Sequence, residues 1–195
     1  MRVKFLTHVA AGAACVLLGT LPALAAIPGR IAAVWAPRHV TFIYQGFTTH
    51  YSCDGLRDEI RNMLTKLGPR DLRVGALGCI RGAGVEPFPG VRVTMQVLVP
   101  AASEHGKAAG APVAAHWQNV VLMPSNAGFE EQGNCELIEQ FKETFLPLFT
   151  TRHISYRSNC IPHQLTLGTH LSAVVLMPDV ERGRRAPPAS GPRKE

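Results

Sequence analysis

The sequence lacks the pairs of closely spaced cysteines and the pairs of closely spaced histidines that often hold metal ions. It contains no C-x-x-C, H-x-x-H or H-x-x-x-H pattern, although zinc sites usually take ligands at such spacings. Charged residues make up only 17% of the chain and aromatic residues 7%, and no face combines the two as nucleic-acid-binding surfaces do. No G-x-S-x-G surrounds Ser52, and no helix follows Gly82 and Gly84. We therefore expect no cofactor, no nucleic-acid partner and no catalytic motif of these kinds.

A long apolar run occurs only at the start of the chain. Arg2 and Lys4 precede an apolar stretch over 5–24, and small residues at 23 and 25 form a signal-peptidase site. We predict a signal peptide over 1–25, which places the mature protein in the periplasm or outside the cell. A retained membrane anchor and a lipoprotein cleaved before Cys15 are the alternatives, and Pro22 argues against the anchor. After removal of the leader we expect no transmembrane helix.

The four cysteines that remain after Cys15 is removed occur in two similar stretches. Ser52-Cys53-Asp54 and, about eighty residues later, Asn134-Cys135-Glu136 each open a helix, and the strands that follow close at Cys79 and Cys160. A helix start lies near the end of the strand that follows it, and exported cysteines normally pair. We therefore predict two disulfides, Cys53–Cys79 and Cys135–Cys160. A reactive thiol at a helix N-terminus is the competing interpretation.

The same pattern divides the chain into two strand-helix-strand-strand repeats. The predicted segments are an N-terminal lead-in over 26–38, a first repeat over 39–100, a linker over 101–115, a second repeat over 116–178 and a disordered tail over 179–195. The predicted strands cover 39–45, 71–78, 91–99, 117–123, 153–159 and 164–177, and the helices begin after Ser52 and Asn134.

These elements predict an α+β fold. Each helix has one apolar stripe and the clearest strands have one apolar face, so we expect a two-layer sandwich with both helices on one side of a mixed or antiparallel sheet. One repeat alone would have a thin core, which favours a single joint domain. Periodicity leaves open whether the six strands form one sheet or two.

The stretch FTTHYSCDGLRDEI, followed by a cysteine after the next strand, resembles exported bacterial proteins of uncharacterised function. The resemblance covers most of the mature chain. It implies export, and it implies no activity, cofactor or partner.

Two groups of residues are candidates for a binding site. His50 and Tyr51 lie at a strand end beside a helix start, and His163 is expected at the equivalent end of the second repeat, where ligands often bind in α/β sheets. Arg92, Thr94 and Gln96 should share the uncovered face of the sheet with His170. Exposed loop histidines and a solvated sheet face are the plainer interpretations of both groups.

We therefore interpret the sequence as an exported cell-envelope protein, a non-catalytic, disulfide-braced binding or structural module. Its partner would be another envelope protein, or a second copy bound through the open sheet face. The alternative is a metal-binding protein or enzyme with a site near His50, Tyr51 and His163.

Overall fold

The computed structural model describes residues 29–47, 50–79, 87–103, 110–122, 135–158, 161 and 169–179. The predicted signal peptide, the helix cap Asn134, Cys160, His163 and all of the predicted tail after Asp179 lie outside these residues.

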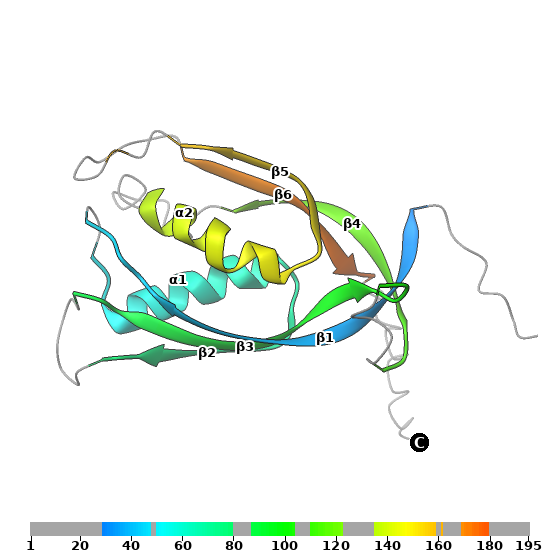
Figure 1. Cartoon of the computed structure of the whole chain (residues 1–195), viewed down its shortest axis with the longest axis horizontal. Coiled ribbons are helices and arrows are strands. Elements are labelled where there is room, and N and C mark those ends of the chain that lie inside the picture. Colours follow the sequence, from blue (N-terminus) through cyan, green and yellow to red (C-terminus); the bar gives the residue numbers. More distant parts are fainter. Residues whose placement is uncertain are drawn as a thin grey trace, which may run out of the picture.

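Six strands and two α-helices make up the fold (Figure 1). In chain order the elements are β1 (Arg30–Ile43), α1 (Cys53–Lys66), β2 (Arg70–Leu77), β3 (Gly90–Pro100), β4 (Val113–Leu122), α2 (Cys135–Thr144), the short 3-10 helix η3 (Leu146–Leu148), β5 (Thr151–Arg157) and β6 (His170–Pro178). We refer to β1, α1, β2 and β3 as the first half and to the remaining elements as the second half.

All six strands belong to one sheet, in the order β2-β3-β1-β4-β6-β5. Every neighbouring pair is antiparallel, which settles the question of one sheet or two. In each half the second strand lies at the edge of the sheet, the third strand lies next to it, and the first strand lies at the centre. The two halves meet through β1 and β4, which pair over four positions from Arg30↔His116 to Ala33↔Val113.

The sheet bends strongly around the two helices. In Figure 1, β1, β2 and β3 lie below the helices and β4, β5 and β6 lie above them, and the two groups converge where β1 meets β4. The helices and the sheet face toward them share one apolar core, to which both halves contribute. Its largest fully buried side chains include Tyr44, Phe141 and Phe145. The predicted α+β class, with both helices on one face of the sheet, is therefore confirmed.

Helix α1 begins and ends where its sequence signals place it. The Ser52 side chain accepts a hydrogen bond from the Gly55 backbone N–H at 3.1 Å, which satisfies one of the free donors of the first turn. The buried side chains Leu56, Ile60, Met63 and Leu64 lie on one helical face. The helix ends before Gly68, whose φ of +69° is a conformation that favours glycine.

Helix α2 is shorter because proline interrupts it. It ends at Thr144, and the 3-10 helix around Pro147 follows. Proline lacks the N–H that an α-helix needs in its interior, so the α-helix does not continue through Pro147.

Two strands begin several residues before the position that the sequence predicts. β1 begins at Arg30 rather than at His39, so most of the predicted lead-in is paired strand, and β4 begins at Val113 inside the predicted linker. In β1, Arg30 to Ala33 pair with β4, and the residues from Ala33 onward pair with β3. Cross-strand pairing therefore overrides the weak alternation around Pro37.

A second apolar cluster lies where the two halves join. Because successive side chains of a strand point to opposite faces, this cluster lies on the face of β1 opposite to the side chains of Val34 and Ala36. Its buried members are Ala33, Leu98, Ala115 and Leu176, with Ile31, Trp35, Val113 and Trp117 packed against them. The guanidinium carbon of Arg70 lies 4.8 Å from the ring centroid of Trp35, and that of Arg152 lies 3.9 Å from the ring centroid of Trp117.

Both edge strands begin irregularly. Asp71 in β2 and His153 in β5 have φ values of +54° and +52°, and each strand then shifts its register, between Arg70 and Arg73 and between Arg152 and Ser155. Residues other than glycine rarely adopt positive φ. The two edges therefore carry the same local distortion at their starts.

Candidate functional site

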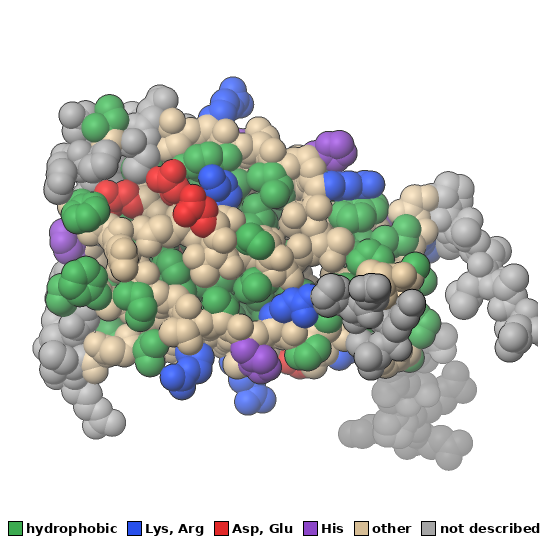
Figure 2. Space-filling view, viewed as in Figure 1, with side chains coloured by type: hydrophobic (Ala, Val, Ile, Leu, Met, Phe, Trp, Pro, Cys, Tyr) green, Lys and Arg blue, Asp and Glu red, His purple; other side chains and the backbone are tan. Residues whose placement is uncertain are grey.

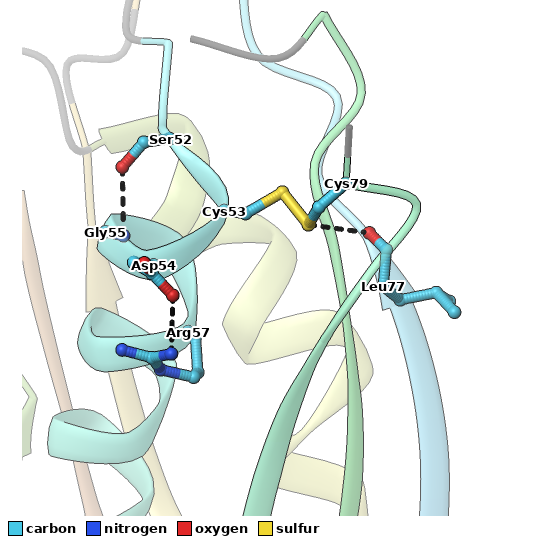
Figure 3. Close-up of a disulfide and its surroundings, with 7 residues drawn as sticks. All are labelled: Ser52, Cys53, Asp54, Gly55, Arg57, Leu77 and Cys79. Atoms are coloured by element: carbon cyan, nitrogen blue, oxygen red, sulfur yellow. Dashed lines mark hydrogen bonds and ion pairs between the residues drawn. A yellow bond between two sulfur atoms is a disulfide. The ribbon is translucent and has the colours of Figure 1, made fainter. Parts of the chain in front are cut away.

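The end of the molecule that is remote from the β1–β4 junction is braced by a disulfide (Figure 3). Cys53 at the start of α1 is bonded to Cys79 just after β2, with their Cα atoms 6.1 Å apart. This pairing was predicted and is confirmed. We call this end the loop end: it contains the β1–α1 connection, the residues that flank β3 at Gly90, and the starts of both helices.

Only one cysteine of the second predicted disulfide lies among the described residues. Cys135 at the start of α2 is buried and disulfide-bonded, whereas Cys160 lies outside the described residues. The pairing of Cys135 with Cys160 stays a prediction.

A buried carboxylate joins the β1–α1 connection to the second half. Glu136, in the first turn of α2, accepts a hydrogen bond from the Tyr44 hydroxyl at 3.3 Å and another from the Phe47 backbone N–H at 2.9 Å. Both donors reach the same oxygen, Oε2. Burial raises the pKa of Tyr44 well above its ordinary range, and the charge and hydrogen bond of Glu136 add to the shift.

Next to this contact, the amide side chain of Gln140 binds the backbone of the β1–α1 connection. Gln140 on α2 accepts a hydrogen bond from the Gln45 backbone N–H at 3.0 Å and donates one to the Gln45 carbonyl at 2.9 Å. The Tyr44 ring stacks edge to face on Tyr51 with centroids 5.1 Å apart. The connection is thus held to α2 by both backbone and side-chain contacts.

Large apolar side chains are exposed at this well-held end. Phe47 and Phe88 are each 65% exposed, and Ile43 is 42% exposed. The Tyr44 N–H donates to the Pro89 carbonyl at 2.9 Å and Ile43 pairs with Gly90, so the segments that carry these side chains are adjacent. We call these three residues the loop-end patch. Figure 2 shows hydrophobic side chains gathered at this end, on the left of the view.

The histidine site predicted at this end is tested only in part. His50 is exposed, and Tyr51 is buried against the core. His163 lies outside the described residues, so its approach to His50 stays a prediction. Among the residues that the structure describes, no group of three or more His, Cys, Asp or Glu side chains is placed to hold a metal ion.

The residues predicted for an open sheet face lie in different halves. Arg92, Thr94 and Gln96 alternate along β3 as expected, and Gln96 donates a hydrogen bond to Asp71 at 2.9 Å. His170 begins β6, on the other side of the helix pair in Figure 1. His170 alternates with core residues, as the three residues of β3 do, so all four lie on the outer face of the sheet. The sheet bends between β3 and β6, and a common binding surface stays a prediction.

Two features of the structure were not anticipated from the sequence. The Tyr44–Glu136 contact joins residues that are far apart in the chain, and no local signal marks it. The paired tryptophan–arginine stacks could have been found, because the same number of positions separates Trp35 from Trp117 and Arg70 from Arg152.

Comparisons with known proteins add no relative to this picture. No family model, curated protein or solved structure matches the chain. Within the described ranges, no helix is both long and apolar enough to span a membrane.

Proposed function

We propose that this chain is an exported, disulfide-braced binding module without catalytic activity, and that the loop-end patch is the surface that docks its partner. The observation that carries the proposal is the exposure of Phe47 and Phe88 on segments that are otherwise tightly held. A monomeric protein rarely exposes clustered large apolar side chains without an interaction role. A rigid support also lowers the ordering cost of binding.

The partner that fits this surface is another protein of the envelope. Aromatic side chains surrounded by polar groups are typical of protein interfaces. Charges of both signs lie beside the patch: Asp54, Arg57 and Asp58 form a network of ion pairs on the first turns of α1. Figure 2 also shows acidic side chains over α2 near this end. An anionic lipid surface would instead favour a basic rim.

Site-specific photo-crosslinking in the producing cell tests this proposal. A photoreactive amino acid at Phe47 or at Phe88 should give an adduct of the same mass, and the same group at Ile154 should not. Ile154 is a matched control because it is an exposed apolar residue on β5, away from the patch. Adducts of the same mass at all three positions, or different adducts at 47 and 88, would count against a docking surface.

The adduct must then be reproduced with purified components. Once mass spectrometry identifies the captured protein, its binding to the full mature chain is measured by calorimetry. Replacing Phe47 or Phe88 with Ser should weaken binding by about tenfold or more, as expected for an aromatic anchor, while Ile154→Ser should leave it unchanged. Equal affinities for all variants would reject the patch.

We further propose that the two halves are repeats of one unit. The strand order read from either edge, the matching irregularities at Asp71 and His153, and the equal spacing of the tryptophan–arginine stacks support this interpretation. A duplicated unit favours a second disulfide between Cys135 and Cys160, and two bridges favour an oxidising compartment.

The mass of the purified exported protein tests both export and the bridges. A mature chain that begins at Ala26 is expected, and alkylation of Cys53, Cys79, Cys135 and Cys160 is expected only after reduction. A free thiol at Cys135 or Cys160 would contradict the second bridge, and an intact leader would contradict export.

A further inference from the structure

The two halves can be aligned residue by residue around the β1–β4 junction. The spacing that relates Trp35 to Trp117 also relates Ile31 to Val113, Ala32 to Ala114 and Ala33 to Ala115. Under this alignment the pair Ala32↔Ala114 corresponds to itself, and the pairs Ile31↔Ala115 and Ala33↔Val113 correspond to each other. The backbone agrees: the Ala101 N–H donates to the Ala32 carbonyl, and the Asp179 N–H donates to the Ala114 carbonyl, both at 3.0 Å. Ala101 and Asp179 are therefore equivalent positions.

Most equivalent positions near this junction hold similar residues, but one group does not. In the first half, Val34 is 3% exposed and packs with Ala36, Val99 and Ala101 in a small apolar cluster. The counterparts of Val34 and Ala101 are His116 and Asp179. The counterpart of Pro112 is Arg30. An apolar cluster on one side of the junction thus corresponds to a charged group on the other, although both occupy the same framework.

The charged group is organised by one carboxylate. Asp179 has a side chain only 17% exposed, and its Oδ1 lies 2.7 Å from His116 Nδ1. Its Oδ2 is buried and lies 2.6 Å from Arg30 Nε, in an ion pair whose geometry is not that of an aligned hydrogen bond. Because Arg30 and His116 also face each other across β1 and β4, one acid fixes two basic side chains from neighbouring strands.

Each basic side chain keeps binding capacity on its other side. Arg30 and His116 are 46% and 37% exposed. Within the described part of the chain, neither makes a further hydrogen bond or ion pair through its remaining nitrogens. A carboxylate oxygen accepts, so Nδ1 of the imidazole is the donor between them, and in the neutral form of the ring Nε2 is then an acceptor. The guanidinium retains its terminal donors for an anion.

We propose that Arg30 and His116, positioned by Asp179, form a binding site for a phosphate group. A hydrogenphosphate or a protonated phosphate ester offers both complements at once: its charged oxygens accept from Arg30, and its P–O–H group donates to Nε2 of His116. A carboxylate at neutral pH lacks that hydroxyl and satisfies only the arginine. The site lies at the β1–β4 junction, away from the loop-end patch, and does not depend on the function proposed for that patch.

Nuclear magnetic resonance titration of the full mature chain tests the site. Inorganic phosphate, glycerol 3-phosphate and acetate are added separately at constant ionic strength. The two phosphates should produce saturable shifts of the amide signals of residues 30, 116 and 179, with affinity on the order of millimolar, and acetate should not. Saturation by glycerol 3-phosphate alone assigns the site to phosphate esters. Equal shifts with acetate would overturn the proposal. Shifts spread over all basic residues would also overturn it, because they would show an adventitious ion only.

Four variants separate a built site from general attraction of anions. Arg30→Gln and His116→Val should each weaken phosphate binding by about tenfold or more, whereas Arg73→Gln, which removes an exposed arginine of β2, should leave it unchanged. His116→Val reproduces the residue found at the equivalent position, so folding should be retained. Asp179→Asn makes the surface more positive, so general attraction predicts tighter binding, whereas loss of positioning predicts weaker binding. Tighter binding in Asp179→Asn would reject the site.

Discussion

Tyr44 shows how one buried hydroxyl connects the two halves. Its ring lies over Gly46, where a Cβ atom would be 1.8 Å from the Tyr44 hydroxyl oxygen, and that hydroxyl donates to Glu136 on α2. Glycine is therefore required by close approach and not by backbone conformation.

Replacing Gly46 with Ala should destabilise the protein by about 1–3 kcal/mol, because either the ring or the connection must move. Equilibrium unfolding in urea measures the loss. Gly78→Ala is a suitable comparison for crowding, because a Cβ at Gly78 meets no atom within 4 Å, although its φ of +75° adds backbone strain. Equal unfolding midpoints for wild type and Gly46→Ala would show that Tyr44 does not cover this glycine.

The raised pKa of Tyr44 predicts a dependence of stability on high pH. The unfolded chain loses this proton near pH 10, while folded Tyr44 keeps it, so the unfolded state binds fewer protons above that pH. The free energy of unfolding should therefore decrease by up to about 1.4 kcal/mol per pH unit. Tyr44→Phe should remove the part of this decrease that Tyr44 causes. Tyr156, whose pKa is also raised by burial, remains in both proteins and contributes equally to both pH profiles. Parallel pH profiles for the two would contradict the assignment.

At the scale of elements, the disulfide holds the start of α1 against the end of β2. Cys53 and Cys79 are 26 positions apart in sequence, and closing such a loop contributes about 3–4 kcal/mol in the chain-entropy model. The variant Cys53→Ser/Cys79→Ser should lose about that much stability in urea unfolding. The variant keeps the disulfide of Cys135, so adding a reductant should destabilise both proteins, and it should destabilise wild type more, by about the share of the Cys53–Cys79 bond. A variant as stable as wild type would show that the bond closes a loop already ordered in the unfolded chain.

Sequence patterns located most elements because the signals were local. Ser52 and Gly68 fix both ends of α1, and β3 alternates between buried and exposed residues over most of its length. The starts of β1 and β4 were missed, because alanines and Pro37 give weak alternation there. Those segments become strands by pairing with each other and with β3, and such pairing cannot be deduced from either segment alone.

The arrangement of the whole molecule was less accessible from sequence. His170 and Arg92 alternate with core residues and so lie on the outer face of the sheet, but the bend of the sheet carries β6 and β3 to opposite sides of the helix pair. The Glu136 contact and the Asp179 group join residues from different elements, so both depend on the strand order. One brace of the loop end, the Cys53–Cys79 bond, was predictable from the repeated cysteine pattern, whereas the loop-end patch that it supports was not.

The shared core predicts that the two halves unfold together. Trp35 and Trp117 are the two tryptophans of the chain, one in each half, so Trp35→Phe and Trp117→Phe each leave a fluorescent reporter in a known half. Because the two halves contribute to one core, both reporters should change at the same urea concentration as the circular dichroism signal of that variant. Separate transitions within one variant would show two independently folding halves.

The irregular starts of β2 and β5 also bear on how the protein behaves at high concentration. These strands are the two ends of the sheet, and a regular edge strand is a template on which another chain can add. Asp71 and His153 turn the backbone into a conformation that cannot continue a ladder, and the shifted register beside each of them misaligns the edge for an incoming strand. Crowded chains would therefore stay dispersed, and a change that straightened either edge would favour growth into filaments.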